Sequence, residues 1–326
     1  MAKDLYPLFG IVTVLNTPFT ASDELDVDGL KQNVRRAMKA GVAGFLVPAM
    51  ASEVYKLTID ERLQMLDVVL EEVGGTVPVI AGAGETDLER SKRLIRLYLD
   101  KGCKHILFQI PYTNEQHFRQ HFLTLAGLGP DVIMLQDWDS SGYGLPDDLI
   151  CALFDEVEAF RCLKVETVPA GVKYSRILQR TQGKLNVSGG WAVTQMIEGL
   201  KRGVHAFMPT GMHFVYTKIY RQFKAGHHEE AEKLFHAILP VLAFSNQHLD
   251  ISVHFFKRLL HKQGIYATAK VRQPILEFDA VFDETADGLI KKIIELEGEM
   301  ESDVENGLDV LPDTLRTSPL NDRLVR

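Results

Sequence analysis

One lysine lies inside an apolar, β-branched stretch of the chain, where it could have a chemical role. The stretch is RCLKVETVP, residues 161–169, which contains Lys164 and, two residues later, Glu166. Residues two apart in a β-strand lie on the same face, so we expect the amine and the carboxylate to lie side by side. A lysine is seldom fully buried unless it is paired or used in chemistry.

Two interpretations fit this pair of side chains. Burial in apolar surroundings disfavours the charged form of a lysine, and a neutral amine can attack a carbonyl carbon to form a Schiff base. Alternatively, Lys164 and Glu166 form an ion pair that serves only the structure. The local sequence leaves both open, so the elements that position the pair have to be considered.

Short apolar runs alternate with helical patterns along most of the chain. The runs are continuous, as strands buried on both faces of a parallel sheet require, and the segments between them have the 3.6-residue period of amphipathic helices. Eight such units predict a closed (β/α)8 TIM barrel, with an open doubly wound sheet as the alternative. The predicted strands lie in residues 9–19, 44–50, 77–84, 105–111, 132–138, 162–167, 185–190 and 205–211.

The chain continues beyond the eighth unit. Helical patterns near residues 228–247, 249–264 and 283–300 predict a C-terminal helical extension. We therefore expect a barrel over residues 1–226 and a helical region over 227–307. Residues 308–326, with Pro312 and Pro319, are expected to be a flexible tail or an arm that contacts another subunit.

In a barrel of this kind, chemistry takes place at the carboxyl ends of the strands. Lys164 and Glu166 lie at the end of the sixth predicted strand, and Gln136 and Asp137 lie at the end of the fifth. Further polar side chains follow the second, seventh and eighth strands; they are Ser52, Glu53, Ser188 and Thr210.

Several of these strand ends resemble those of one enzyme group. The matching motifs are NTPF at residues 16–19, Ser52-Glu53, Pro111-Tyr112 with Asn114, and CLKVET at residues 162–167. In this order they resemble the dihydrodipicolinate synthase/N-acetylneuraminate lyase superfamily of class I Schiff-base lyases, over roughly residues 8–300. The resemblance implies that Lys164 is the Schiff-base lysine, that the fold is an eight-fold barrel with a C-terminal helical region, and that the protein is a homotetramer.

The chain departs from the synthase pattern at three places. The synthase sequence GTTGE is Ala-Met-Ala-Ser-Glu here, residues 49–53, so two hydroxyls are lost. Leu135 is expected at the position of the catalytic tyrosine, and Thr113 at that of a second tyrosine. Dihydrodipicolinate synthesis in its standard form is therefore not expected.

The same positions resemble the sugar-acid dehydratase branch of the superfamily, which includes 2-keto-3-deoxyarabonate dehydratase. The shared features are Ser52-Glu53, Gln136-Asp137 followed by Ser141-Gly142, and a lysine strand that contains Lys164-Val165-Glu166-Thr167. We therefore predict dehydration of a 2-keto-3-deoxy sugar acid. The same enamine could instead support a pyruvate-dependent aldolase or synthase, and a barrel that only binds a sugar acid is a third possibility.

The predicted dehydratase needs an electron sink, an acid/base pair and groups that hold the substrate. Lys164 would form the iminium, Glu166 and Asp137 would move protons, and Gln136 would orient them. Ser52 with neighbouring backbone amides would bind the carboxylate, with Glu53 beside it, and Ser188 and Thr210 would bind hydroxyls. No cofactor is expected, because the iminium itself is the electron sink.

Composition limits the other classes of partner. The chain has 326 residues with a net charge of −8 and no basic stripe, which disfavours nucleic-acid binding. It has no apolar stretch long enough to cross a bilayer, and its three cysteines are typical of reduced core thiols in a cytoplasmic protein. His117 and His121 lie four residues apart, but the segment HFRQH favours a helix face over a metal site, and no metal is expected.

Overall fold

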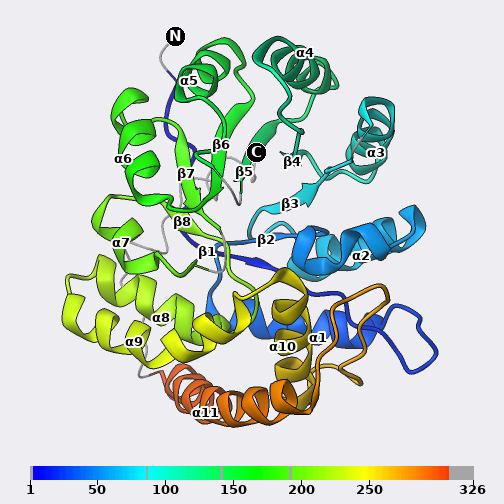
Figure 1. Ribbon diagram of the computed structural model, residues 1–326, viewed down its shortest axis with the longest axis vertical. Coiled ribbons are helices and arrows are strands. Elements are labelled where there is room, and N and C mark those ends of the chain that lie inside the picture. The colour runs from blue at the N-terminus through cyan, green and yellow to red at the C-terminus, as the bar shows by residue number, and fades with distance from the viewer. Residues whose placement is uncertain (1–2, 86, 140–141, 191–192, 308–326) are drawn as a thin grey trace.

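Eight parallel strands close into a barrel in the computed structural model of the chain (Figure 1). The structure describes residues 3–85, 87–139, 142–190 and 193–307. Each strand pairs with the next, and β8 pairs with β1. The predicted (β/α)8 barrel is thus confirmed, and the open sheet is excluded. The strands are β1 (Gly10–Val14), β2 (Gly44–Leu46), β3 (Val79–Gly82), β4 (His105–Phe108), β5 (Val132–Asp139), β6 (Phe160–Thr167), β7 (Asn186–Gly189) and β8 (Ala206–Phe207).

A helix follows each strand and covers the outside of the barrel. These helices begin and end where local chemistry predicts: the side chain of Asp26 caps α1, and Thr58 and Glu61 form a capping box at the start of α2. The helices are α1 (Val27–Ala40), α2 (Ile59–Val73), α3 (Leu88–Asp100), α4 (Glu115–Ala126), α5 (Asp147–Glu156), α6 (Gly171–Arg180), α7 (Met196–Lys201) and α8 (His213–Lys224).

The two faces of the strands pack into two separate cores. Side chains that point inward fill the barrel, among them Val12, Leu46, Met134 and Cys162. Side chains that point outward pack against the surrounding helices in a larger core. Burial on both faces explains why the strands are continuous apolar runs in the sequence. A polar residue at the carboxyl end of a strand therefore faces either the barrel mouth or the helix layer, according to strand alternation.

The C-terminal extension is confirmed as a group of helices on one side of the barrel. It consists of α9 (His228–Ser245), α10 (Leu249–Lys262) and α11 (Ala280–Glu305). Figure 1 shows them together at the bottom of the view, and α10 packs on η1 (Met50–Ser52), a short 3-10 helix after β2. The extension thus reaches the strand ends at which chemistry is expected. The tail over residues 308–326 lies outside the described part of the chain.

No helix in the described ranges has both the length and the apolar character needed to cross a membrane.

Candidate active site

Strand β6 places Lys164 and Glu166 side by side on the inner face of the barrel. The Lys164 Nζ lies 3.0 Å from Oε1 of Glu166, and the two side chains are 6% and 10% exposed. Cys162, two residues earlier, lies deeper in the barrel core. The expected alternation therefore holds, and the amine and the carboxylate occupy the inner end of the strand together.

Gln136 lies directly across from Lys164 on the neighbouring strand β5. The register pairs Gln136 with Lys164 and Trp138 with Glu166, and Gln136 Nε2 donates a hydrogen bond to Oε2 of Glu166. The carboxylate of Glu166 is thus held between the lysine and the glutamine amide. It also lies against Gly190, where a Cβ atom would be 2.2 Å from Oε1 of Glu166, so only glycine fits there.

Leu135, expected at the position of the family's catalytic tyrosine, faces away from Lys164. Leu135 is fully buried in the outer core, between the strands and the helices. Its successor Gln136 is the residue beside Lys164. Neighbouring residues of a strand lie on opposite faces, so Gln136, and not Leu135, faces the lysine.

Asp137 does not reach Lys164. Its side chain is fully buried, lies 2.5 Å from the Nζ of Lys173 on α6, and accepts a hydrogen bond from the Leu145 N–H at 2.7 Å. Burial raises the pKa of the Asp137 carboxyl above its usual range, although Lys173 opposes the rise. Because Asp137 follows Gln136, it must face the helix layer. The predicted acid/base role of Asp137 is therefore corrected to a contact between barrel and helix.

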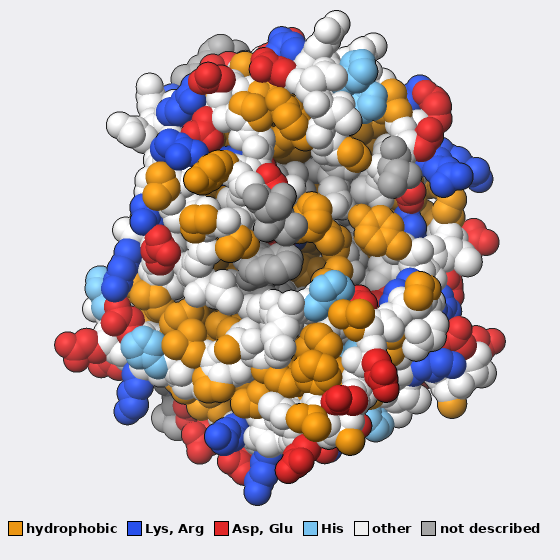
Figure 2. All heavy atoms as spheres, viewed as in Figure 1, with side chains coloured by type: hydrophobic (Ala, Val, Ile, Leu, Met, Phe, Trp, Pro, Cys, Tyr) orange, Lys and Arg blue, Asp and Glu red, His pale blue; other side chains and the backbone are white. Residues whose placement is uncertain are grey.

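Lys164 and Glu166 face a chamber at the mouth of the barrel. Its volume is about 80 Å³, and Trp138 separates it from a wider cleft of about 490 Å³. In Figure 2, most charged side chains of the viewed face lie near the outer edge of the molecule. The chamber is lined by Val14, Ala49, Met50, Ala51, Trp138, Lys164, Glu166, Met208, Thr210, Ser245, Asn246, His248, Leu249, Ser252 and Phe256.

The wider cleft on the other side of Trp138 has aromatic and polar walls. Tyr55 and Tyr112, both largely exposed, line it together with Gln109 and Gln136. The two cavities share Trp138 as a lining residue.

The loop after β2 offers backbone donors to the chamber. Within the described residues, neither the Met50 N–H nor the Ala51 N–H donates a hydrogen bond. The Ser52 hydroxyl, in contrast, is already used, because it donates to the Leu15 carbonyl at 2.5 Å and accepts from the Ala49 N–H at 3.0 Å. Ser52 does not line the chamber, and its hydrogen bonds hold the backbone of this loop in place.

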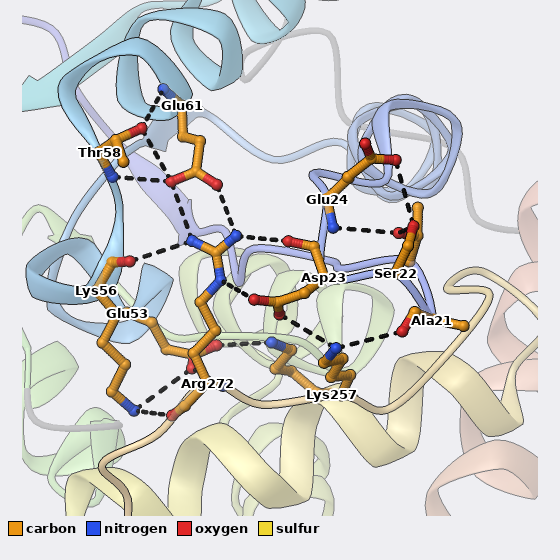
Figure 3. Close-up of polar contacts among 12 residues, drawn as sticks. Ala21, Ser22, Asp23, Glu24, Glu53, Lys56, Thr58, Glu61, Lys257 and Arg272 are labelled. Carbon is orange, nitrogen blue, oxygen red and sulfur yellow. Dashed lines mark hydrogen bonds and ion pairs between the residues drawn. The ribbon is translucent and has the colours of Figure 1, made fainter.

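Glu53 points away from the chamber, into a polar cluster that joins the loop to the C-terminal extension (Figure 3). Its Oε2 accepts a hydrogen bond from Lys257 Nζ on α10 at 2.6 Å, and its Oε1 accepts one from the Arg272 N–H at 3.0 Å. Burial lowers the pKa of Lys257 to about 8, although Glu53 raises it. The guanidinium of Arg272 lies between Asp23 and Glu61. Glu53 thus connects the loop after β2, helix α10 and the segment that contains Arg272.

The two predicted hydroxyl-binding residues differ in position. Thr210, after β8, lines the chamber, and no hydrogen bond of its hydroxyl occurs among the described residues. Ser188 on β7 pairs in register with Lys164 but is fully buried, and its hydroxyl donates to the Leu163 carbonyl at 3.3 Å. Ser188 therefore lies beside the base of Lys164 and does not line the chamber. Ser141 lies outside the described residues.

The sequence analysis missed the part of the chamber that comes from the extension. Ser245, Asn246, His248 and Ser252 lie on the end of α9, the following turn and the start of α10. Their spacing is ordinary for a helix–turn–helix connection, and they lie about 80 residues from Lys164 in sequence. No local pattern connects them with the barrel strands.

The described residues contain no group of three or more His, Cys, Asp or Glu side chains arranged to hold a metal ion. His117 and His121 lie on α4, along a separate cavity that is also lined by α3.

Comparison with known proteins identifies the family. The profile of the Dihydrodipicolinate synthetase family matches residues 7–293. The chain belongs to this family. Its members are lyases and aldolases, so the superfamily resemblance of the sequence motifs is confirmed.

The relatives of this chain include proteins named as synthases and one named as a dehydratase. A 4-hydroxy-tetrahydrodipicolinate synthase of Methanoculleus marisnigri is 26% identical over 83% of this chain and 94% of its own. An L-2-keto-3-deoxyarabonate dehydratase of Azospirillum brasilense is 27% identical over 82% of this chain and 89% of its own. The crystal structure of dihydrodipicolinate synthase from Rhodopseudomonas palustris superposes with a TM-score of 0.81 at 20% identity, covering 89% of this chain and 99% of its own, which supports the fold alone.

Proposed function

We propose that this lyase dehydrates a 2-keto-3-deoxy sugar acid through a Schiff base on Lys164. The observation that carries the proposal is the pair at the end of β6: Lys164 Nζ lies 3.0 Å from Glu166 Oε1, and both residues line one chamber. A nucleophile and a candidate base at this separation can act on adjacent atoms of one substrate.

The reaction begins with the amine of Lys164. Neutral Nζ attacks the C2 carbonyl carbon, water leaves, and a protonated imine remains on the lysine. The positive nitrogen acidifies the C3 protons. The carboxylate of Glu166, adjacent to Nζ, removes one of them, and the electron pair forms an enamine. Glu166 then gives this proton to the C4 hydroxyl, which leaves as water, and the enamine becomes an unsaturated imine. Hydrolysis of the imine releases the dehydrated keto acid and the free lysine.

The remaining groups of the chamber hold the substrate in this orientation. The unused N–H groups of Met50 and Ala51 are the donors for the C1 carboxylate. Gln136 holds the Glu166 carboxylate through its amide, so that Oε1 stays beside Lys164. A pentonate or hexonate chain is longer than a keto acid such as pyruvate, and Thr210 in the chamber wall can bind one of its hydroxyls.

Dehydration is favoured over condensation by what replaces the tyrosine. A phenol hydroxyl can carry protons between the imine and a second substrate, whereas the amide of Gln136 cannot donate or take up a proton at neutral pH. Glu166 is then the group nearest to Lys164 that can do so. The 27% identical dehydratase from Azospirillum brasilense acts on a substrate of the proposed kind.

The test is borohydride trapping combined with product analysis. The protein is incubated with a 2-keto-3-deoxy pentonate or hexonate, with and without borohydride. We expect a mass increase on the peptide that contains Lys164 and, without borohydride, a dehydrated keto acid with little free pyruvate. An adduct at another lysine, or none, would contradict the proposal. Pyruvate as the main product, or faster condensation of pyruvate with aspartate semialdehyde, would favour the aldolase or synthase alternative.

Two variants separate the steps. Lys164→Arg keeps a positive charge beside Glu166 but cannot form a Schiff base, so we expect a folded protein with neither adduct nor turnover. Glu166→Gln should still form the adduct, and its turnover should fall by a factor of about 10²–10⁴, as is typical for loss of a general acid/base. A Glu166→Gln variant with full turnover would exclude Glu166 as the base.

A further inference from the structure

Apart from Thr210, the polar side chains of the chamber fall into two separate sets. Lys164 and Glu166 lie on β6, and a second set lies on the end of α9, the α9–α10 turn and the start of α10 (yellow in Figure 1). The second set consists of Ser245, Asn246, His248 and Ser252. Much of the remaining wall is apolar and contains Val14, Ala49, Met208 and Phe256.

Two atoms of the second set are buried without a partner. The Ser245 side chain is fully buried, and neither its Oγ nor the Nδ2 of Asn246 makes a hydrogen bond within the described part of the chain. Buried polar atoms are nearly always hydrogen-bonded, so each exception needs an explanation. Ser245 and Asn246 both contribute to the chamber wall, so a rotation of either side chain would turn its unpaired hydroxyl or amide towards a molecule bound in the chamber.

Their neighbours in the same turn do have partners. Gln247 donates from Nε2 to the Phe244 carbonyl at 3.0 Å, and the Asp250 N–H donates to Nδ1 of His248 at 3.1 Å. The lack of partners is thus not common to the whole turn. It is confined to Ser245 and Asn246, which both line the chamber.

We propose that Ser245 and Asn246 bind the hydroxyl groups of the substrate's chain and so determine which 2-keto acids are accepted. This inference rests on the proposed function, because it assumes a keto acid bound to Lys164. The substrate class is a 2-keto acid with hydroxyls beyond C3, since the serine hydroxyl can donate and accept and the Asn246 amide can donate to a hydroxyl oxygen. An unsubstituted alkyl chain would leave both atoms unpaired, as they are in the free protein.

The turn is also held in a defined place. Lys257 on α10 is bound to Glu53 at 2.6 Å, and Glu53 directly follows the loop that carries Met50 and Ala51. The chamber wall formed by the α9–α10 turn and the proposed carboxylate site are therefore joined through one buried ion pair. Such an arrangement fixes the distance between the two ends of a substrate before it binds.

The experiment compares two keto acids of equal length. One is a 2-keto-3-deoxy pentonate and the other is 2-oxopentanoate, which lacks the hydroxyls. The rate of borohydride-trapped adduct formation at Lys164 is measured for both at subsaturating concentration. For Ser245→Ala we expect about a 10-fold lower rate with the pentonate and less than about a twofold change with 2-oxopentanoate, as for loss of one hydrogen bond. Adding Asn246→Leu should extend the loss with the pentonate to about 100-fold.

Two controls guard against a structural explanation. Ser91→Ala removes a buried hydroxyl on α3 that does not line the chamber, and Gln247→Ala changes the same turn on a residue outside the chamber wall. Both should keep the wild-type ratio of the two rates. The thermal midpoint of Ser245→Ala should be no lower than that of the wild type, because its hydroxyl has no partner to lose in the free protein.

The outcomes distinguish this inference from the proposed function. Equal loss with both keto acids, or a lower thermal midpoint for Ser245→Ala, would overturn the role in hydroxyl binding and leave the Schiff base on Lys164 intact. Absence of any adduct at Lys164 in the wild type would overturn the proposed function and this inference with it.

Discussion

The buried ion pair between Glu53 and Lys257 makes a quantitative prediction about stability. Lys257 Nζ lies 2.6 Å from Glu53 Oε2, and the side chains are 0% and 2% exposed. Glu53→Gln would leave the ammonium of Lys257 buried without its partner. Loss of one partner of a buried pair typically costs about 3–5 kcal/mol. With an m-value of about 3 kcal/mol per M in urea, the unfolding midpoint should fall by about 1–1.7 M.

A matched pair on the surface serves as the control. Lys101 and Asp67 are also 2.6 Å apart, but their side chains are 40% and 46% exposed. Asp67→Asn should therefore cost only about 0.2–1 kcal/mol, as is usual for exposed pairs. If Glu53→Gln costs no more than Asp67→Asn, the reasoning from burial is refuted.

The double variant Glu53→Gln/Lys257→Met tests the origin of the cost. It removes both charges, and exchange of a buried ion pair for uncharged groups is often neutral, so we expect most of the lost stability to return. The same variant tests the original prediction that Glu53 binds substrate. Because Glu53 does not line the chamber, borohydride trapping at Lys164 should survive. A stable double variant without trapping would show that substrate binding depends on Glu53, directly or through the position of the loop.

The pH dependence provides a further check on this pair. The folded-state pKa of Lys257 is lowered from 10.5 to about 8, chiefly by burial. Between these two values the unfolded chain binds more protons than the folded one, so this group makes stability rise with pH. The wild type should show this rise from about pH 8 to about pH 10.5, and Lys257→Met should lack it. The measurement is the free energy of unfolding in urea at several pH values.

Two residues outside the chamber and the assembly of the protein allow further tests. Asp137→Asn should lower the free energy of unfolding by about 3–5 kcal/mol, because it leaves the buried ammonium of Lys173 without its carboxylate. Turnover should change by less than about 10-fold. A loss of 10²-fold or more in a folded variant would support the catalytic role of Asp137. Burial lowers the pKa of His213 to about 3 from 6.5, so its contribution to stability should fall as the pH drops below about 6.5, by about 1.4 kcal/mol per pH unit. Urea unfolding of the wild type and His213→Gln at pH 4–7 should reveal that difference, and parallel pH curves would contradict it. Light scattering should give the mass of a homotetramer at micromolar concentration, and the mass of a monomer would contradict the expected assembly.

Much of the site's chemistry could be predicted from the sequence because it depends on local rules. Strand alternation alone places Lys164 and Glu166 on one face, and this holds in the structure. The eight-fold alternation of apolar runs and helical patterns likewise predicts the closed barrel. Both signals repeat within a few residues, so no contact between distant segments is needed to read them.

Strand register was decided only by the tertiary structure. The pairing of β5 with β6 shifts by one residue between Ile133 and Met134. A shift of this kind has no signature in the sequence, yet it determines that Gln136, and neither Leu135 nor Asp137, lies opposite Lys164. Alternation then sends Asp137 to Lys173 in the helix layer. A prediction that assumes regular pairing cannot decide which polar residue of β5 reaches the lysine.

The far wall of the chamber was also decided only by tertiary structure. The sequence determined that helices follow the barrel, because their amphipathic period is local. It did not determine that the α9–α10 turn would bring Ser245 and Asn246 into the same chamber as Lys164. That placement depends on the packing of α10 against the loop after β2 and on the ion pair between Lys257 and Glu53, residues about 200 positions apart. Such contacts arise from the shape and charge of folded surfaces, which no single segment of the chain contains.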